Sequence, residues 1–182
     1  KFHGTGDLKA LNNKGFSYFG DWFEGLRHGK GTQIYPTKGR YIGSWRNDKR
    51  DGYGDFTSSL EHCDLLASDA LNDPAPLADP LFNLPLDYCT YSGEWKENLP
   101  TGYGKFLIRF DTIRLLSERF YRITKESRFI PIIARLKHYE RLPAQIELIG
   151  IWSQGIPQKC RVTVTDKNSK TIYSENIDFF KE

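Results

Sequence analysis

The sequence predicts a mainly β fold, an elongated and twisted antiparallel sheet of β-hairpins with an inserted α-helical segment. Two recurring features predict the hairpins. Tyr, Gly and Trp recur together at alternate positions, and further glycines follow each copy. Residues at alternate positions of a strand share one face, and glycine allows tight turns and close backbone approach. A later stretch instead carries apolar residues at helical spacing, which predicts the insertion.

The alternating pattern contains all four tryptophans of the 182-residue chain. It spans 18–22, 41–45 and 91–95, and a looser fourth copy at 148–152 begins with Leu148. Three residues after each Trp comes a residue that tolerates positive φ, where a hairpin must turn: Gly25, Asp48, Asn98 and Gly155. A Gly-x-Gly pair is then predicted to open the returning strand in the first three copies. Each copy is therefore predicted to form one β-hairpin.

These residues resemble the MORN repeat, the membrane occupation and recognition nexus motif. The 23-residue spacing between Tyr18 and Tyr41 matches the length of that motif. The resemblance implies hairpins that stack into an extended sheet, since one hairpin cannot bury its own aromatic face. Asp48 and Asn98 depart from the motif by replacing a turn glycine. Gly4 and Gly6 are interpreted as the tail of a copy whose head lies upstream, as the absence of Met also suggests.

The repeats and their interruptions predict five segments. They are MORN repeats over 1–58, an acidic Pro/Leu-rich insertion over 59–90, a MORN repeat over 91–110, a basic helical insertion over 111–143, and a degenerate MORN-like hairpin with a C-terminal hairpin over 144–182. The C-terminal hairpin is predicted from the alternating run 161–165 and the turn cluster 166–169.

The two insertions carry opposite charge. Residues 61–90 hold six acidic residues, four prolines and no Lys or Arg. They form either a partner-binding arm or a loop that folds back on the sheet. Residues 60–71 also allow a short helix. The second insertion predicts helices over 112–126 and 131–142. Its basic helices either cap the sheet, bind an acidic protein surface or contact an anionic membrane.

Composition and charge exclude several functional classes. A net charge of +3 is too small and too dispersed for a nucleic-acid binder. No apolar window is long enough for a membrane-spanning helix. Three cysteines, odd in number and outside any CxxC pattern, argue against a disulfide framework or zinc ribbon and favour a reducing compartment. The four His are scattered, so we predict no catalytic residue, no metal site, no cofactor and no enzymatic activity.

The predicted function is a non-catalytic protein-interaction scaffold, a structural subunit of a cytoskeletal or axonemal assembly. We expect cytoplasmic, cytoskeleton-associated localisation, including the axoneme of a cilium or flagellum, and protein partners within a large multi-subunit assembly. The alternatives are an adaptor that contacts phosphoinositide or anionic lipid and a regulatory MORN region of a larger enzyme. The predicted partner-binding residues line an aromatic groove: Tyr18, Trp22, Tyr41, Trp45, Tyr91 and Trp95. The competing interpretation buries the same rings as the core of the sheet.

Overall fold

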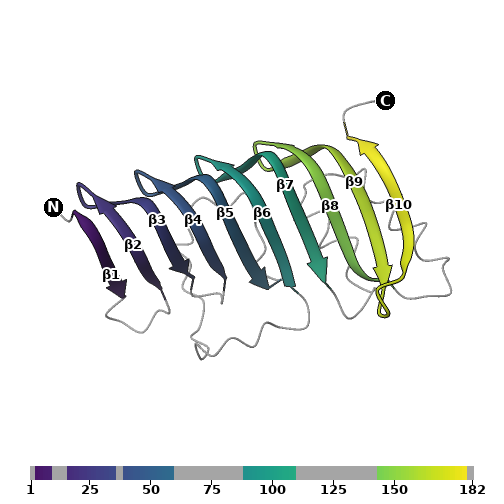
Figure 1. Cartoon of the computed structure of the whole chain (residues 1–182), viewed down its shortest axis with the longest axis horizontal. Coiled ribbons are helices and arrows are strands. Elements are labelled where there is room, and N and C mark those ends of the chain that lie inside the picture. Colours follow the sequence, from purple (N-terminus) through teal and green to yellow (C-terminus); the bar gives the residue numbers. More distant parts are fainter. Residues whose placement is uncertain (1–2, 10–15, 36–38, 60–87, 110–142, 180–182) are drawn as a thin grey trace.

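The computed structural model describes residues 3–9, 16–35, 39–59, 88–109 and 143–179, and every regular element in these ranges is a strand. The ten strands form one antiparallel sheet in which each strand pairs with its neighbours in the sequence (Figure 1). They are β1 (Gly4–Lys9), β2 (Ser17–Phe23), β3 (Leu26–Ile34), β4 (Arg40–Arg46), β5 (Lys49–Ser59), β6 (Tyr88–Lys96), β7 (Leu99–Arg109), β8 (Pro143–Ser153), β9 (Ile156–Asp166) and β10 (Thr171–Asp178).

The strands stand side by side in one layer, and the two ends of the chain lie at opposite ends of the elongated sheet (Figure 1). This confirms the predicted fold of consecutive antiparallel hairpins, including the C-terminal hairpin β9–β10. The predicted helices of both insertions, over 60–71, 112–126 and 131–142, lie outside the described residues. No helix in the described part of the chain is long and apolar enough to cross a membrane.

Each of the four repeat hairpins closes through a two-residue turn with both central residues at positive φ. The pairs are Glu24 and Gly25 (51° and 85°), Asn47 and Asp48 (49° and 65°), Glu97 and Asn98 (49° and 73°), and Gln154 and Gly155 (48° and 79°). Such turns match the right-handed twist of the flanking strands. The four predicted turn positions are thus confirmed, and Asp and Asn replace glycine because they too tolerate this conformation.

Contrary to the prediction, the Gly-x-Gly pairs do not open the returning strands. They lie inside these strands. Strand β3 already begins at Leu26, which pairs with Phe23 directly across the short turn. Gly29 has a φ of 60°, and the register of β2 and β3 shifts between Gly20 and Trp22. The first glycine of each pair therefore belongs to a bulge within the hairpin, which increases the local twist.

One glycine from each of β1 to β8 forms a continuous row across the sheet, in which neighbouring glycines are paired. The row consists of Gly6, Gly20, Gly31, Gly43, Gly54, Gly93, Gly104 and Gly150. A Cβ atom at Gly31 would lie 2.2 Å from the hydroxyl oxygen of Tyr18, and one at Gly54 would lie 2.3 Å from that of Tyr41. The glycines thus let the tyrosine rings lie flat against the backbone.

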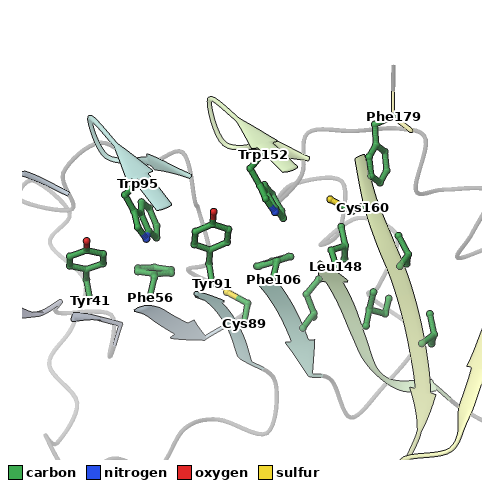
Figure 2. Packing of buried hydrophobic residues seen from close by; sticks show 14 of the residues in the cluster. Tyr41, Phe56, Cys89, Tyr91, Trp95, Phe106, Leu148, Trp152, Cys160 and Phe179 are labelled. Atoms are coloured by element: carbon green, nitrogen blue, oxygen red, sulfur yellow. The ribbon is translucent and has the colours of Figure 1, made fainter. Parts of the chain in front are cut away.

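The tyrosines and tryptophans of the repeats form a ladder on one face, which we call the ring face. Its seven rings, in spatial order, are Trp22, Tyr18, Trp45, Tyr41, Trp95, Tyr91 and Trp152. Successive rings meet edge to face, with centroids 5.1 Å apart within a repeat and 5.3–5.5 Å apart between repeats. Edge-to-face contacts add to the stabilisation from burial. Phe56, Phe106 and Leu148 extend this core along the sheet (Figure 2).

The first and last strands complete the repeat geometry. Gly4 pairs with Trp22 and Gly6 with Gly20, as Gly-x-Gly pairs do between later repeats, so β1 occupies the place of a returning strand. At the other end Phe179 is fully buried in the core, and Ile177 packs against the core.

The cysteines differ from the expectation in one respect. Cys89 on β6 is disulfide-bonded, whereas Cys160 on β9 is a free, buried thiol. An odd count requires only that one thiol stays unpaired, so it does not exclude a single disulfide bond. Cysteine usage therefore no longer supports a reducing compartment.

Candidate interaction surface

The six predicted partner-binding residues lie together on the ring face. Five of them are buried within this chain, with exposed fractions of 0–3%, and Trp22 is partly exposed near the β1 end. This geometry corresponds to the interpretation in which the rings form the core. Five of these side chains already contact the rest of the chain, so their contact with a partner stays a prediction.

Each repeat tyrosine is anchored through its hydroxyl group. The hydroxyls of Tyr18 and Tyr41 donate hydrogen bonds to backbone carbonyls three residues along the chain, each at 3.0 Å, and Tyr91 does so at 3.2 Å. Burial raises the pKa of Tyr18 to about 12 and raises the pKa values of Tyr41 and Tyr91 further. These tyrosines therefore remain neutral and serve as structural donors.

The tryptophans bind each repeat to the one before it. The indole nitrogen of Trp45 donates to the carbonyl of Gly31 at 3.2 Å, and that of Trp95 donates to the carbonyl of Gly54 at 3.0 Å. Trp152 is the exception, because its buried indole nitrogen has no hydrogen-bond partner within the described residues. The junction between the third and fourth hairpins therefore lacks one of the bonds that join the others.

Two buried arginines form a second link between repeats. Arg27 is 6% exposed, and its Nε and backbone N–H both donate to Asp48 Oδ1, at 2.9 and 2.8 Å. Arg50 and Asn98 repeat this arrangement one hairpin later, where the Arg50 backbone N–H donates to Asn98 Oδ1 at 2.8 Å. Pro100 takes the equivalent place in the third repeat, paired with Trp95. A buried arginine requires such partners for its charge and donors.

The opposite side of the sheet, which we call the outer face, exposes a different set of apolar side chains. Among them are Phe19 (60% exposed), Ile42 (41%), Tyr53 (59%), Tyr103 (59%) and Ile151 (46%). They occupy the variable positions between the ring-face residues, so they are not among the residues that recur from copy to copy. Their sequence signal is the alternation with Tyr, Gly and Trp, because residues between ring-face positions of a strand lie on the opposite face of the sheet.

Over β2–β5 the outer face forms an open groove of about 510 Å³. Its floor is the stretch of the glycine row from Gly20 to Gly54, and its apolar walls are Phe19, Ile42 and Tyr53. The remaining lining is polar: Thr5, Asp21, Lys30, Thr32 and Asp55.

Most of the charged groups in the groove already have partners within the sheet. Asp21 accepts hydrogen bonds from the Lys30 backbone N–H at 2.9 Å and from the Thr5 hydroxyl at 3.0 Å, and these bonds lower its pKa. The Lys30 ammonium donates to the Ser44 hydroxyl at 2.8 Å. Asp55 is exposed and has no salt bridge to any described residue.

Comparison with known proteins identifies the repeats. The family model of the MORN repeat matches residues 18–40, 41–59 and 91–108. This chain therefore carries three MORN repeats. Over 44 residues it is 41% identical to MORN repeat-containing protein 3 of Xenopus laevis, a stretch that covers 24% of this chain and 18% of that protein. The fourth hairpin, β8–β9, lies beyond the matched segments. It departs from the MORN pattern, because Leu148 stands in place of Tyr and no Gly-x-Gly pair follows Trp152.

The MORN-repeat family is typically non-catalytic, and its repeats generally mediate protein or membrane interactions. Within the described ranges, no three His, Cys, Asp or Glu side chains come close enough together to hold a metal ion. The outer face of this sheet exposes apolar rings with charged side chains beside them. Such groups suit contact with another macromolecule.

Proposed function

We propose that this MORN-repeat chain is a non-catalytic protein-interaction scaffold, a structural subunit of a cytoskeletal or axonemal assembly. One observation carries the proposal, the exposure of Phe19, Tyr53 and Tyr103 on the outer face. Exposed rings supply large contact areas at a small cost in side-chain entropy, and aromatic residues are enriched where proteins bind one another. The ring-face residues support this role by holding the sheet in one shape.

The architecture also suits an assembly in which one subunit bridges several others. The sheet is a single layer with its strands in sequence order, so its outer face extends along all the repeats (Figure 1). Repeat proteins of this kind offer long binding surfaces. The proposed location is the cytoplasm, in association with the cytoskeleton or with the axoneme of a cilium or flagellum.

Fractionation of cells that express the tagged protein tests this proposal. We expect the protein in the detergent-insoluble cytoskeletal fraction and, by imaging, along filaments or axonemes. Uniformly soluble, diffuse protein in ciliated and non-ciliated cells alike would contradict a structural role in such an assembly.

The two alternative functions stay predictions. The basic segment that motivates membrane contact, 111–143, lies outside the described residues. Flotation with vesicles of anionic lipid at low salt tests membrane contact, because electrostatic attachment weakens as salt screens the charges. The role as a regulatory region of a larger enzyme requires the full-length protein, assayed with and without these repeats.

A further inference from the structure

We propose that the groove over β2–β5 binds a peptide segment of a partner protein that carries apolar side chains and one Lys or Arg, whose cation pairs with Asp55. This inference rests on the proposed function as a protein-interaction scaffold and assigns the contact to one part of the outer face. The occupant is defined by its chemistry, an apolar segment with a single positive charge.

The floor of the groove allows a partner to approach the sheet closely. The backbone of the paired glycines Gly20–Gly31 and Gly43–Gly54 forms this floor. A Cβ at any of these positions would point to the opposite, ring face, where the repeat tyrosines lie, and not into the groove. Phe19 and Ile42 lie beside this floor, because each of them pairs with Thr32 on β3. Tyr53 of β5 also lines the groove. Apolar side chains of a partner could therefore contact the backbone and these walls together.

The charge of the groove determines which apolar segment fits. Asp55 pairs in register with Ile42 and lies two residues from Tyr53 on the same strand, so its carboxylate stands beside two apolar walls. A purely apolar partner would remove the water that hydrates this carboxylate and would offer no hydrogen-bond donor in its place, which costs free energy. A partner cation beside Asp55 offsets that cost, and an arginine could bind the carboxylate through two hydrogen bonds.

The same charges disfavour anionic partners. The Lys30 ammonium, the cation of the groove, already bonds to Ser44, whereas Asp21 and Asp55 both carry negative charge. Phosphate groups of lipids or nucleic acids would meet two carboxylates. Charge complementarity therefore favours a basic peptide.

The third repeat differs from the second at the decisive positions. Tyr103 corresponds to Tyr53 and is equally exposed at 59%, but the residue two positions later is Lys105, which forms a salt bridge with Glu147. Ser92 stands where Phe19 and Ile42 stand in the first two repeats. Among the described strands, these apolar walls and a carboxylate without a salt bridge to a described residue therefore occur together over β2–β5, and Tyr103 is a matched control.

Selection of peptides against the full chain tests the inference. Random 12-residue peptides displayed on phage are selected on the immobilised protein, and enriched peptides are synthesised and measured by fluorescence anisotropy. We expect enriched peptides to carry Lys or Arg among apolar residues. Tyr53→Ala is expected to weaken their binding about ten-fold, whereas Tyr103→Ala changes it less than about two-fold.

Two charge variants separate pairing from general apolar contact. Asp55→Lys is expected to abolish binding of the basic peptides and Asp55→Asn to weaken it about ten-fold, with the loss largest at low salt. Asp55 and Tyr53 are exposed, so the variants should keep the near-ultraviolet circular dichroism of the wild type. Enriched peptides that lack a cation, or that bind Asp55→Lys as tightly as the wild type, overturn the inference, as does a selection without enrichment.

Failure of this inference can be told apart from failure of the proposed function. If Tyr53→Ala and Asp55→Lys stay in the cytoskeletal fraction while Tyr103→Ala and Ile151→Ala leave it, the scaffold function stands and the groove is not its contact. If the wild type never enters that fraction but binds the basic peptides, the cytoskeletal assignment fails and the groove stands.

Discussion

The guanidinium of Arg27 lies 4.3 Å from the ring centroid of Trp45, a residue of the following repeat. Arg50 and Trp95 repeat this relationship at 4.4 Å. The contact adds a cation–π attraction to the hydrogen bonds between Arg27 and Asp48 and places a buried charge at each of two junctions between repeats. The stability of the array therefore depends on contacts that cross from one repeat to the next, as in other repeat proteins.

Replacing Arg27 by methionine is expected to reduce the free energy of unfolding by about 2 kcal/mol, because charged hydrogen bonds and the contact with Trp45 are both lost. Denaturant unfolding measures the change. The control is Arg46→Met, whose salt bridge to Asp51 is formed by a 69% exposed side chain and should contribute less than about 1 kcal/mol. Equal losses in the two variants would show that the buried arginine has no special role.

Glycine in the row beneath the tyrosines is expected to be irreplaceable where a ring lies on it. Gly54→Ala places a Cβ 2.3 Å from the hydroxyl oxygen of Tyr41, and overpacking of this kind typically costs about 1–3 kcal/mol. Gly6→Ala is the matched control in the same row, because its Cβ would meet Trp22 at an ordinary 3.5 Å. Thermal unfolding should show a lower Tm for Gly54→Ala and a nearly unchanged Tm for Gly6→Ala.

The junction before β8 is expected to open before the others. Pro100 replaces the arginine there, and the Trp152 indole nitrogen lacks a hydrogen-bond partner in the described structure. Native-state hydrogen exchange should show lower protection in β8 and β9 than in β4 and β5. The double variant Pro100→Arg with Gly155→Asp restores the arrangement of Arg27 and Asp48 and should raise protection of β8 by about 1 kcal/mol. Unchanged protection would place the weakness elsewhere.

Stability is expected to fall in alkaline solution because buried acids resist ionisation. Burial raises the pKa of Cys160 from 9.0 and that of Tyr18 from 10.0, in both cases to about 12. The unfolded chain therefore loses these protons at lower pH than the folded one. Their contribution is complete below pH 9 and is lost progressively as pH rises toward 12.

Unfolding by urea at a series of pH values measures this loss. In the Cys160→Ala variant the free energy of unfolding should begin to decline one pH unit higher, at the pKa that tyrosine has in the unfolded chain. A stability that stays constant up to pH 12 would contradict the burial of these groups.

The turns and the ring face could be predicted from the sequence because they depend on local rules. Positive φ at Asp48 and Asn98 follows from residue type and position, and the shared face of Tyr and Trp follows from their alternation. The burial of Arg27 could not be predicted in this way, because arginine is normally exposed and its partner Asp48 belongs to the next hairpin.

The groove was also beyond sequence reasoning, because it depends on register. Phe19, Ile42 and Tyr53 belong to three strands, and the bulge in each hairpin determines which residues come together. Recurrence reveals the residues that every repeat shares. A groove formed by the variable residues of two repeats produces no such signal.

We propose that the ring face is structural whereas the outer face binds partners. The most direct test is the distribution of a Phe19→Ser, Tyr53→Ser, Tyr103→Ser variant between the soluble and cytoskeletal fractions. All three side chains are more than half exposed, so the fold should keep its circular dichroism and unfolding midpoint. We predict that this variant moves to the soluble fraction, whereas Thr163→Ala, which alters a polar side chain of β9, stays with the cytoskeleton. A folded triple variant that remains in the cytoskeletal fraction would contradict the claim.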